Sequence, residues 1–321
     1  MIAQTQIHLA PFQGITGGTF RKIFSRHFRG VDKFFTPFFT NISADSKLSP
    51  RKLAELGETF ENGVEVVPQV LSKVAEEIIH FGKFCHQLGF TELNWNLGCP
   101  YPMVANKKRG SGMLPYPELI DEILQKVMAE IPIHFSVKCR LGYNSAEEIE
   151  KLVPIFNQYP VSEITIHARI GKQLYNGSTN LEAFCEAASK LTVPLSYNGD
   201  VFSRSDFERL NLQFPAINTW MIGRGLLMDP FLAQKIKGIE LPDDCQAHIR
   251  RFVEELYSGY RRQLNNNLAV LGILKEYWKY LANSFNDPHQ VFKNLKKVNN
   301  FEDYEDAISF IFNEFKWIGS K

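Results

Sequence analysis

Short runs of β-branched and aromatic residues alternate along most of the chain with longer segments whose apolar residues recur at helical spacing. This alternation is typical of parallel strands joined by crossover helices. Eight strand-then-helix units predict an α/β protein built on a closed (β/α)₈ TIM barrel. The predicted strands are 7–9, 33–38, 64–69, 92–96, 134–139, 163–167, 195–198 and 219–222.

Two of the predicted helices carry clear signals. Apolar residues recur with a helical period through 74–88, and the segment 116–129 follows Pro115, which suits the start of a helix. Near residue 240 the sequence Glu-Leu-Pro-Asp-Asp ends the strand-helix pattern, and the rest of the chain is predicted to be helical. We therefore expect a barrel domain at 1–239 and an all-helical domain at 240–321.

The predicted helical tail mixes basic and aromatic residues, which leaves two interpretations open. The mixture suits an RNA-binding surface, but acidic residues roughly match the basic ones, and the aromatics could form the tail's own core. The basic residues are Arg250, Arg251, Arg261, Arg262, Lys275, Lys279, Lys293, Lys296 and Lys297. The aromatic residues are Tyr257, Tyr260, Tyr277, Trp278 and Tyr280.

Composition and charge narrow the function classes. The 321 residues are 44% hydrophobic, and the formal net charge of +1 gives no global attraction to nucleic acid, so RNA contacts would need local basic clusters. No apolar run is long enough to span a bilayer, so we expect a cytoplasmic protein without membrane contact. The five cysteines are odd in number and lack a C-x-x-C pair, which argues against a disulfide framework and a zinc site, and we expect no metal.

Unusual polar residues stand at the ends of six of the predicted strands. In a (β/α)₈ barrel the carboxyl ends of the strands assemble the active site, so we expect these residues to meet there. They are Gln69 on the third strand, Asn96 to Cys99 on the fourth, Lys138 to Arg140 on the fifth, His167 to Arg169 on the sixth, Asn198 to Asp200 on the seventh and Gly223 to Gly225 on the eighth.

The last two strand ends suit a phosphorylated ligand. Barrels frequently bind phosphate after strands seven and eight, where glycines allow the backbone to approach closely. Either motif alone, Asn-Gly-Asp or Gly-Arg-Gly, could be a tight turn. Together at adjacent strand ends they favour a phosphate site.

Two further side chains suggest chemistry. A desolvated Lys138 could form a Schiff base in an aldolase, or its ammonium could stabilise an anionic reduced flavin, with Gln69 bonding the ring edge. Cys99 lies in a Gly-Cys-Pro turn that should project its thiol into the barrel mouth. A thiol is mostly protonated near neutral pH, so Cys99 suits general-acid work as well as nucleophilic attack. We expect Cys85, Cys139 and Cys185 to be inert core residues.

An ordered set of motifs resembles the dihydrouridine synthases. They are L-A-P-F-Q-G-I-T from Leu9, P-Q-V-L from Pro68, N-L-G-C-P from Asn96, G-S-G-M-L from Gly110, S-V-K-C-R-L-G from Ser136, H-A-R-I-G-K-Q-L-Y-N-G from His167, N-G-D from Asn198 and M-I-G-R-G from Met221. The resemblance spans the barrel and extends more weakly into the tail, at 274–281 and 291–299, which are similar to the short bacterial members of the C subfamily.

The resemblance implies an FMN enzyme, reduced by NADPH, that converts uridine to 5,6-dihydrouridine in tRNA, in its D-loop. It implies Cys99 as the proton donor to uracil C5, opposite the hydride delivered from flavin N5 to C6. The implied FMN contacts are Pro11, Phe12, Gln13, Gln69, Lys138, His167, Asn198, Gly199, Asp200, Gly223 and Arg224. The implied substrate contacts are Asn96, Arg140, Arg169 and Tyr175. We expect a monomer.

The basic residues Lys107, Lys108, Arg109, Arg140, Arg169 and Lys172 are expected on loops after the fourth to sixth strands, where they could meet an RNA backbone or serve solubility alone. Three positions depart from the family pattern. Asn94 stands where an aspartate is common, Met103 replaces a basic residue, and 36–39 lacks an acidic residue. Two other functions therefore stay open: an FMN barrel acting on a small molecule, and a catalytically silent RNA-binding barrel.

Overall fold

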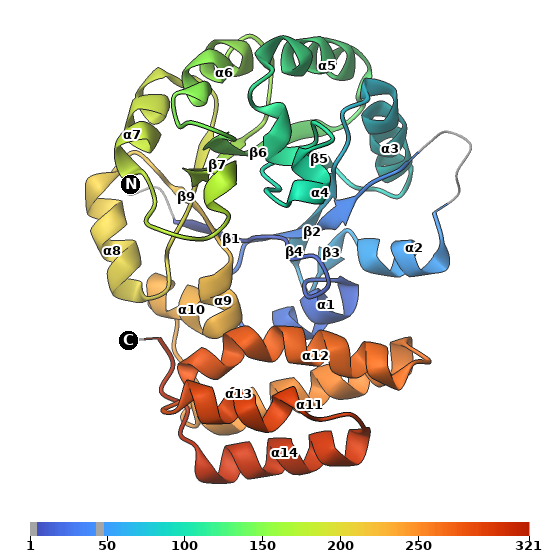
Figure 1. Ribbon diagram of the computed structural model, residues 1–321, viewed down its shortest axis with the longest axis vertical. Coiled ribbons are helices and arrows are strands. Elements are labelled where there is room, and N and C mark those ends of the chain that lie inside the picture. Colours follow the sequence, from blue (N-terminus) through green and yellow to red (C-terminus); the bar gives the residue numbers. More distant parts are fainter. Residues whose placement is uncertain (1–4, 43–47, 321) are drawn as a thin grey trace.

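Eight parallel strands close into a barrel in the computed structural model, which describes residues 5–42 and 48–320. The first strand pairs with both the second and the last, and this double pairing closes the sheet. The strands are β1 (Gln6–Leu9), β2 (Lys33–Phe39), β4 (Val64–Val70), β5 (Glu92–Leu97), β6 (His134–Gly142), β7 (Ile164–Ile170), β8 (Leu195–Asn198) and β9 (Thr219–Ile222). The predicted barrel and its eight strands are confirmed (Figure 1).

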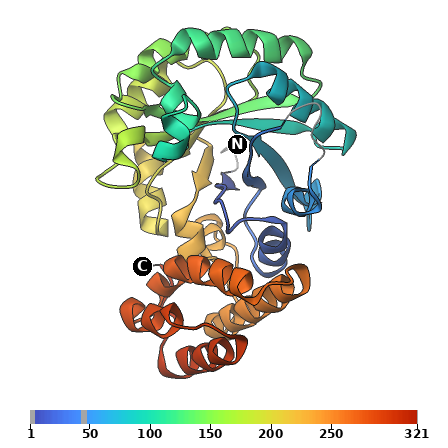
Figure 2. The same cartoon turned by 45° about the vertical axis from the view of Figure 1, so that its right-hand side comes forward.

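Helices cover the outside of the barrel, and the helices of the tail lie against one side of it (Figures 1 and 2). The barrel helices are α1 (Gly18–His27), α2 (Pro50–Leu56), α3 (Ala75–Gln87), α4 (Pro102–Ala105), α5 (Pro117–Glu130), α6 (Glu148–Phe156), α7 (Leu181–Lys190), α8 (Arg204–Gln213), α9 (Arg224–Met228) and α10 (Leu232–Lys237). The tail helices are α11 (Cys245–Gln263), α12 (Asn267–Leu281), α13 (Pro288–Lys296) and α14 (Phe301–Glu314). Short 3₁₀ turns lie at Gly110–Met113, Gly171–Gln173 and Ala282–Ser284.

Two strands run three residues further than the sequence predicts. The strands β6 and β7 end at Gly142 and Ile170, so Arg140 and Arg169 lie within strands and not on the loops where we expected them. Both side chains are buried. Their expected position as surface cations is therefore wrong, because the parallel pairing of β6 with β7 continues past the polar residues.

A short strand, β3 (Phe60–Glu61), was not predicted. It pairs antiparallel with the start of β4 through a two-residue turn at Asn62 and Gly63, where φ is +50° and +83°. An Asn-Gly pair with positive φ at both positions is the usual tight hairpin turn. The dipeptide was the available signal in the sequence, but a two-residue strand gives no hydrophobic alternation to support it.

Side chains alternate between two buried environments along β5 to β8. Leu93, Trp95, Val137 and Ile166 belong to the apolar layer between the strands and the outer helices. The residues between them are polar and equally buried, among them Asn94, Asn96, Ser136, Arg140, Thr165, His167, Ser196 and Asn198. Since successive side chains of a strand point to opposite faces, this half of the barrel interior is polar. The other half holds the small apolar cluster of Ala10, Phe35, Val67 and Met221.

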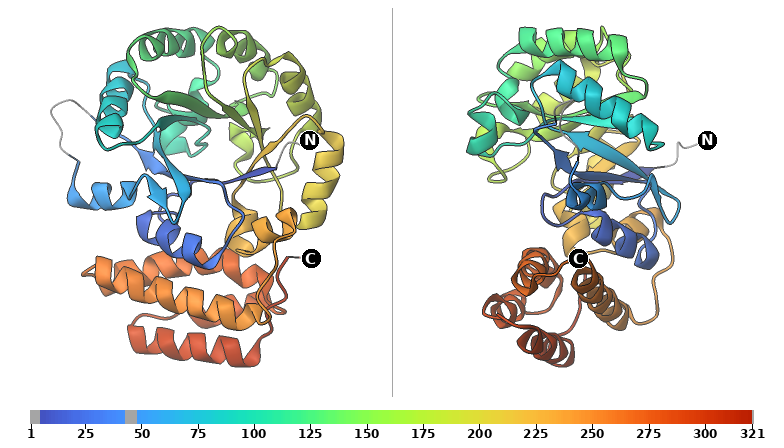
Figure 3. Two further views of the ribbon diagram at one scale, coloured as in Figure 1. Left: turned by 180° about the vertical axis from the view of Figure 1, so that it is seen from behind. Right: turned by 90° about the vertical axis from the view of Figure 1, so that its right-hand side faces the viewer.

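The tail packs against the barrel through α1 and α11. Phe252 of α11 is fully buried, and its ring contacts those of Phe20, Phe24 and Phe28. The hydroxyl of Tyr260 donates to the carbonyl of Ile15 at 3.2 Å. The tail helices therefore lie directly beside the barrel (Figure 3). The expected boundary at residue 240 falls between α10 and α11, and the division into two folding domains stays a prediction.

The aromatic residues of the tail are mostly core. Tyr257, Tyr260, Tyr277 and Trp278 are buried, whereas Tyr280 is only partly buried. One sequence expectation is wrong here: Cys185 lies exposed on α7, because its helical position faces solvent, while Cys85 and Cys139 are buried as expected. Within the described chain, no helix combines the length and hydropathy that a membrane crossing requires.

Replacing Phe252 with alanine should destabilise the joint between the barrel and the tail. Removal of a fully buried phenylalanine from an aromatic cluster typically costs about 3–5 kcal/mol of unfolding free energy. Urea unfolding measures the loss. Phe310→Ala is the control, since Phe310 is 48% exposed and should cost no more than about 0.5 kcal/mol. Equal losses for the two variants would contradict this account of the joint.

Candidate active site

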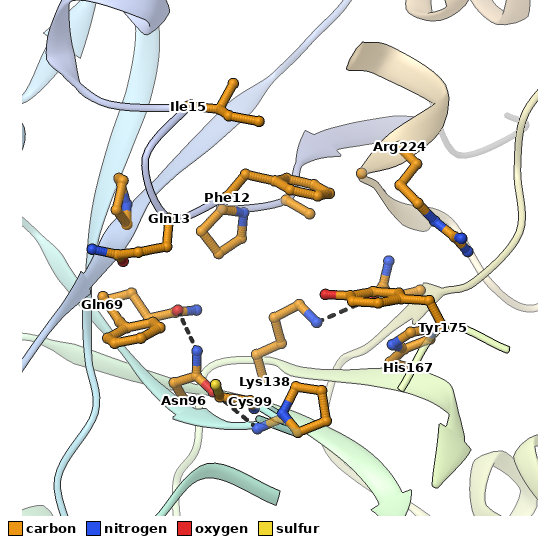
Figure 4. Close-up of a pocket in the computed structure, with 18 of the residues that line it drawn as sticks. Phe12, Gln13, Ile15, Gln69, Asn96, Cys99, Lys138, His167, Tyr175 and Arg224 are labelled. Atoms are coloured by element: carbon orange, nitrogen blue, oxygen red, sulfur yellow. Dashed lines mark hydrogen bonds between the residues drawn. The ribbon is translucent and has the colours of Figure 1, made fainter. Parts of the chain in front are cut away.

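One cavity lies at the carboxyl ends of the barrel strands, and Figure 4 shows the side chains that point into it. Except for Asp200 and Arg169, every predicted site residue lines it. These are Pro11, Phe12, Gln13, Gln69, Asn96, Cys99, Lys138, Arg140, His167, Tyr175, Asn198, Gly199, Gly223 and Arg224. The structure thus brings Cys99 and Lys138 to the same mouth.

Lys138 is a partly buried cation. Its Nζ donates to Oδ1 of Asn198 at 2.9 Å, and the amide of Asn198 is itself held by donation to the carbonyl of Met221. Burial, followed by the nearby Arg140, lowers the pKa of Lys138 to about 8, so the ammonium form still dominates at pH 7. Among the described residues no carboxylate forms a salt bridge with it. An ammonium that is partly shielded from water and faces a cavity suits an anionic ligand group.

Cys99 is 8% exposed, and its backbone is held on both sides. Its N–H donates to Oδ1 of Asn96 at 2.9 Å, and its carbonyl accepts from both the backbone N–H and the hydroxyl of Ser111 at 3.0 Å. Burial raises the pKa of the Cys99 thiol, although Arg140 and Lys138 act in the opposite direction. The thiol is therefore protonated at neutral pH, as a proton donor must be.

The Gly-Ser-Gly motif packs directly against the Cys99 loop. A Cβ on Gly110 would lie 2.7 Å from the carbonyl oxygen of Cys99, and Gly110 has φ of +56°. A Cβ on Gly112 would lie 2.1 Å from the carbonyl oxygen of Ala105. Both glycines are therefore required by close approach of the backbone, which explains why this motif accompanies Cys99.

The amides of Gln69 and Asn96 form one unit beside the thiol. Nδ2 of Asn96 donates to Oε1 of Gln69 at 2.6 Å, and Nε2 of Gln69 donates to Oδ1 of Asn94 at 2.8 Å. A primary amide has two N–H donors and an oxygen with two lone pairs. Gln69 therefore keeps one N–H and one lone pair for a ligand in the cavity.

His167 is neutral in this site. Burial, followed by the charges of Arg140 and Lys138, lowers the pKa of His167 well below its ordinary value. Its Nε2 lies 3.4 Å from Nη1 of Arg169, which can only donate, so the ring proton is on Nδ1. The imidazole can thus offer one N–H to the cavity without adding a charge.

Arg140 ties the Cys99 loop to the loop after β7. Its Nε donates to the carbonyl of Gly98 at 3.0 Å, and its Nη1 donates to the carbonyl of Leu174 at 2.7 Å. The guanidinium carbon lies 5.4 Å from the ring centre of Tyr175. Burial lowers the pKa of Arg140 to about 10, which leaves it charged at neutral pH. Arg140 therefore holds Tyr175 and Cys99 in one relative position.

Asp200 and Arg169 do not line the cavity, but they contact residues that do. The carboxylate of Asp200 accepts from Nη1 of Arg169 at 2.9 Å and from Nη2 of Arg224 at 2.7 Å. Of the three, only Arg224 lines the cavity. Asp200 and Arg169 together thus orient the Arg224 guanidinium. The family resemblance implied direct ligand contacts for Asp200 and Arg169, and this indirect position differs from that expectation.

Sequence reasoning missed three polar lining residues, Tyr101, Glu276 and Tyr280. Two of them come from α12 of the tail, and the Tyr280 ring meets that of Phe12 edge to face at 5.6 Å between centres. The tail aromatics were visible in the sequence, but no pattern indicated which of them would reach the barrel mouth. The helical tail therefore supplies part of the cavity wall.

In the described ranges, no group of three or more His, Cys, Asp or Glu side chains could hold a metal ion. The sequence model of dihydrouridine synthases matches residues 8–314, nearly the whole chain. The chain belongs to the dihydrouridine synthase family. The predicted resemblance is confirmed, and the cavity residues described above lie within the matched range.

Relatives of known name support the family assignment. The chain is 24% identical over 316 residues to the tRNA-dihydrouridine(16) synthase of Neisseria meningitidis serogroup B, which covers 95% of this chain and 94% of the relative. It is 26% identical over 272 residues to tRNA-dihydrouridine synthase B of Pasteurella multocida, with 80% and 79% covered. The solved structure of morphinone reductase shares the fold, with a TM-score of 0.52 over 76% of this chain and 88% of that chain at 10% identity.

The protonated state of Cys99 can be tested through its reactivity. Because burial disfavours the thiolate and raises the pKa of Cys99, the inflection in its alkylation rate should lie at a higher pH than that of a free thiol, whose pKa is about 8.5. Iodoacetamide labelling with mass spectrometry of the Cys99 peptide measures this, and Cys99→Ala identifies labelling of the other cysteines. An inflection at or below pH 8.5 would show a thiolate-stabilising site instead.

Proposed function

We propose that this protein reduces uridine to 5,6-dihydrouridine in tRNA, with FMN as its cofactor and NADPH as the reductant. The observation that carries the proposal is the placement of a protonated, buried Cys99 thiol and a partly buried Lys138 ammonium in one cavity of a dihydrouridine synthase barrel.

The donor set of the cavity fits a flavin. The Lys138 ammonium pairs with no carboxylate of the described residues, which suits the side of the isoalloxazine ring that becomes anionic on reduction. Gln69 keeps one donor and one acceptor for the ring edge. Pro11, Phe12 and Gln13 would line the ring. Arg224, with Asn198, Gly199 and Gly223 beside it, would hold the phosphate at the ends of β8 and β9.

Reduction of uracil adds a hydride at C6 and a proton at C5. Bound FMN supplies the hydride. Cys99 gives its proton to C5, and the resulting thiolate recovers a proton from water. Until that happens, the adjacent Arg140 and Lys138 stabilise the thiolate, since both lower the pKa of Cys99. Asn96 and Tyr175 would contact the uracil from the cavity wall.

The substrate must reach the cavity as an unstacked nucleotide. A uracil within folded RNA cannot enter a barrel mouth, so the target nucleotide is extruded and held by aromatic and basic side chains. Three tyrosines line the cavity and would hold the extruded base: Tyr101, Tyr175 and Tyr280. The tail, with Lys293, Lys296 and Lys297 exposed, would bind the body of the tRNA.

The position modified is proposed to be uridine 16 in the D-loop, because full-length relatives are named for that position. Arg169 would act on the substrate indirectly, through Asp200 and Arg224. We place the enzyme in the cytoplasm as a monomer.

Loss of the gene should remove dihydrouridine at position 16, as mapped in cellular tRNA by mass spectrometry. A wild-type copy should restore it.

Cys99→Ala should bind FMN with wild-type absorbance but turn over tRNA at least about 100-fold more slowly, because a positioned general acid contributes that much. Unchanged turnover of Cys99→Ala at neutral pH would exclude the acid role.

The gene deletion, together with the flavin content of the purified protein, distinguishes the two other functions that the sequence leaves open. A flavin-containing protein whose deletion leaves every tRNA dihydrouridine in place would be a reductase of a small molecule. A colourless protein that binds tRNA but does not take up added FMN would be a silent RNA-binding barrel.

A further inference from the structure

A continuous chain of hydrogen bonds runs inside the polar half of the barrel. It begins at the N–H groups of Gly98 and Cys99, which donate to Oδ1 of Asn96 at 3.0 and 2.9 Å. Nδ2 of Asn96 donates to Gln69 at 2.6 Å, and Gln69 donates to Asn94 at 2.8 Å.

The chain of hydrogen bonds ends at the carboxylate of Glu92. Nδ2 of Asn94 donates to Oγ of Ser136 at 2.8 Å, and the Ser136 hydroxyl donates to Oε1 of Glu92 at 2.5 Å. The other oxygen of Glu92 accepts from Nζ of Lys33 at 2.7 Å. The five side chains between Cys99 and Lys33 come from β4, β5 and β6, and all five are buried: Asn96, Gln69, Asn94, Ser136 and Glu92.

Every donor in the chain points the same way, from the Cys99 loop toward Glu92. The two ends impose this direction, because backbone N–H groups can only donate and a carboxylate can only accept. An amide placed between them has one permitted orientation. The direction therefore follows from chemistry and does not depend on which amide atom is drawn as oxygen.

We propose that Ser136 and Asn94 are positioning residues that orient the amide of Gln69 toward the flavin and hold the Cys99 loop through Asn96. This inference rests on the proposed function for its flavin half only. Neither Ser136 nor Asn94 lines the cavity, so both act through Gln69. Hydrogen bonds in a buried chain reinforce one another, and loss of one link leaves its neighbours unpaired.

The chain also gives a physical meaning to Asn94, which stands where the family commonly has an aspartate. An amide can accept from Gln69 and donate to Ser136 at the same time, whereas a carboxylate can only accept. In this protein the negative charge lies two links further on, at Glu92, beside Lys33. Asn94 thus passes the direction imposed by that charge on to Gln69.

The barrel offers a matched control for Ser136. Ser196 of β8 is also a fully buried serine, but its hydroxyl has no hydrogen-bond partner among the described residues. Ser136→Ala and Ser196→Ala remove the same atom from neighbouring parts of one interior. Only the first should interrupt the chain.

Two measurements on the full-length protein test the proposal. Ser136→Ala should weaken FMN binding about tenfold, measured by quenching of flavin fluorescence, since a buried donor is left unpaired. In flavin-free protein, Cys99 should be alkylated at least about threefold faster than in the wild type, since its loop loses part of its anchor. Ser196→Ala should stay within about twofold of the wild type in both measurements, and exposed Cys185 is the internal reference for labelling.

Asn94→Leu is the second variant, close to the same shape, and it should reproduce both effects because it removes the acceptor for Gln69 and the donor to Ser136. Ser136→Ala and Asn94→Leu proteins that fold with wild-type melting temperature and match Ser196→Ala in both measurements would overturn the proposal. If the wild type itself takes up no FMN, the proposed function fails, while the labelling of Cys99 still decides whether the chain positions its loop.

Discussion

Partial burial of the ammonium group of Lys138 costs free energy that hydrogen-bond acceptors or an opposite charge must offset. The protein supplies one acceptor, Oδ1 of Asn198, and leaves the remaining N–H groups facing the cavity. The surrounding charges are mostly positive, from Arg140 and Arg224, while His167 stays neutral. The cavity therefore surrounds a cation whose charge and remaining N–H groups a bound anionic ring would pair. Closure of the barrel shields this cation from water.

The same closure explains the polar interior. Strands buried on both faces usually read as continuous apolar runs, but β5 to β8 alternate between apolar residues that meet the helices and polar residues that face inward. A buried polar side chain needs partners, and here the partners come from the next strand. The result is a hydrogen-bonded half of the barrel that holds Gln69 and the Cys99 loop, beside an apolar half around Phe35 and Met221.

Much of this arrangement could be predicted from the sequence, because strand periods and strand ends are local signals. The eight strands follow from alternation, and a barrel places residues as distant as Gln69 and Arg224 at one mouth. Other features depend on contacts between distant segments. Nothing local shows that Tyr280 reaches Phe12, that Asp200 turns toward Arg169 and Arg224, or that β7 continues to Ile170. These outcomes are set by tertiary packing, which a single sequence does not display.

The reduction potential of bound FMN tests the central claim most directly, in Lys138→Met compared with the wild type. Methionine keeps much of the length of the side chain but removes the charge that would stabilise the anionic reduced ring. The account predicts that the two-electron potential becomes more negative by at least about 30 mV, which corresponds to a tenfold loss of preference for the reduced form. An unchanged potential in a variant that still binds FMN would contradict the role assigned to this cation.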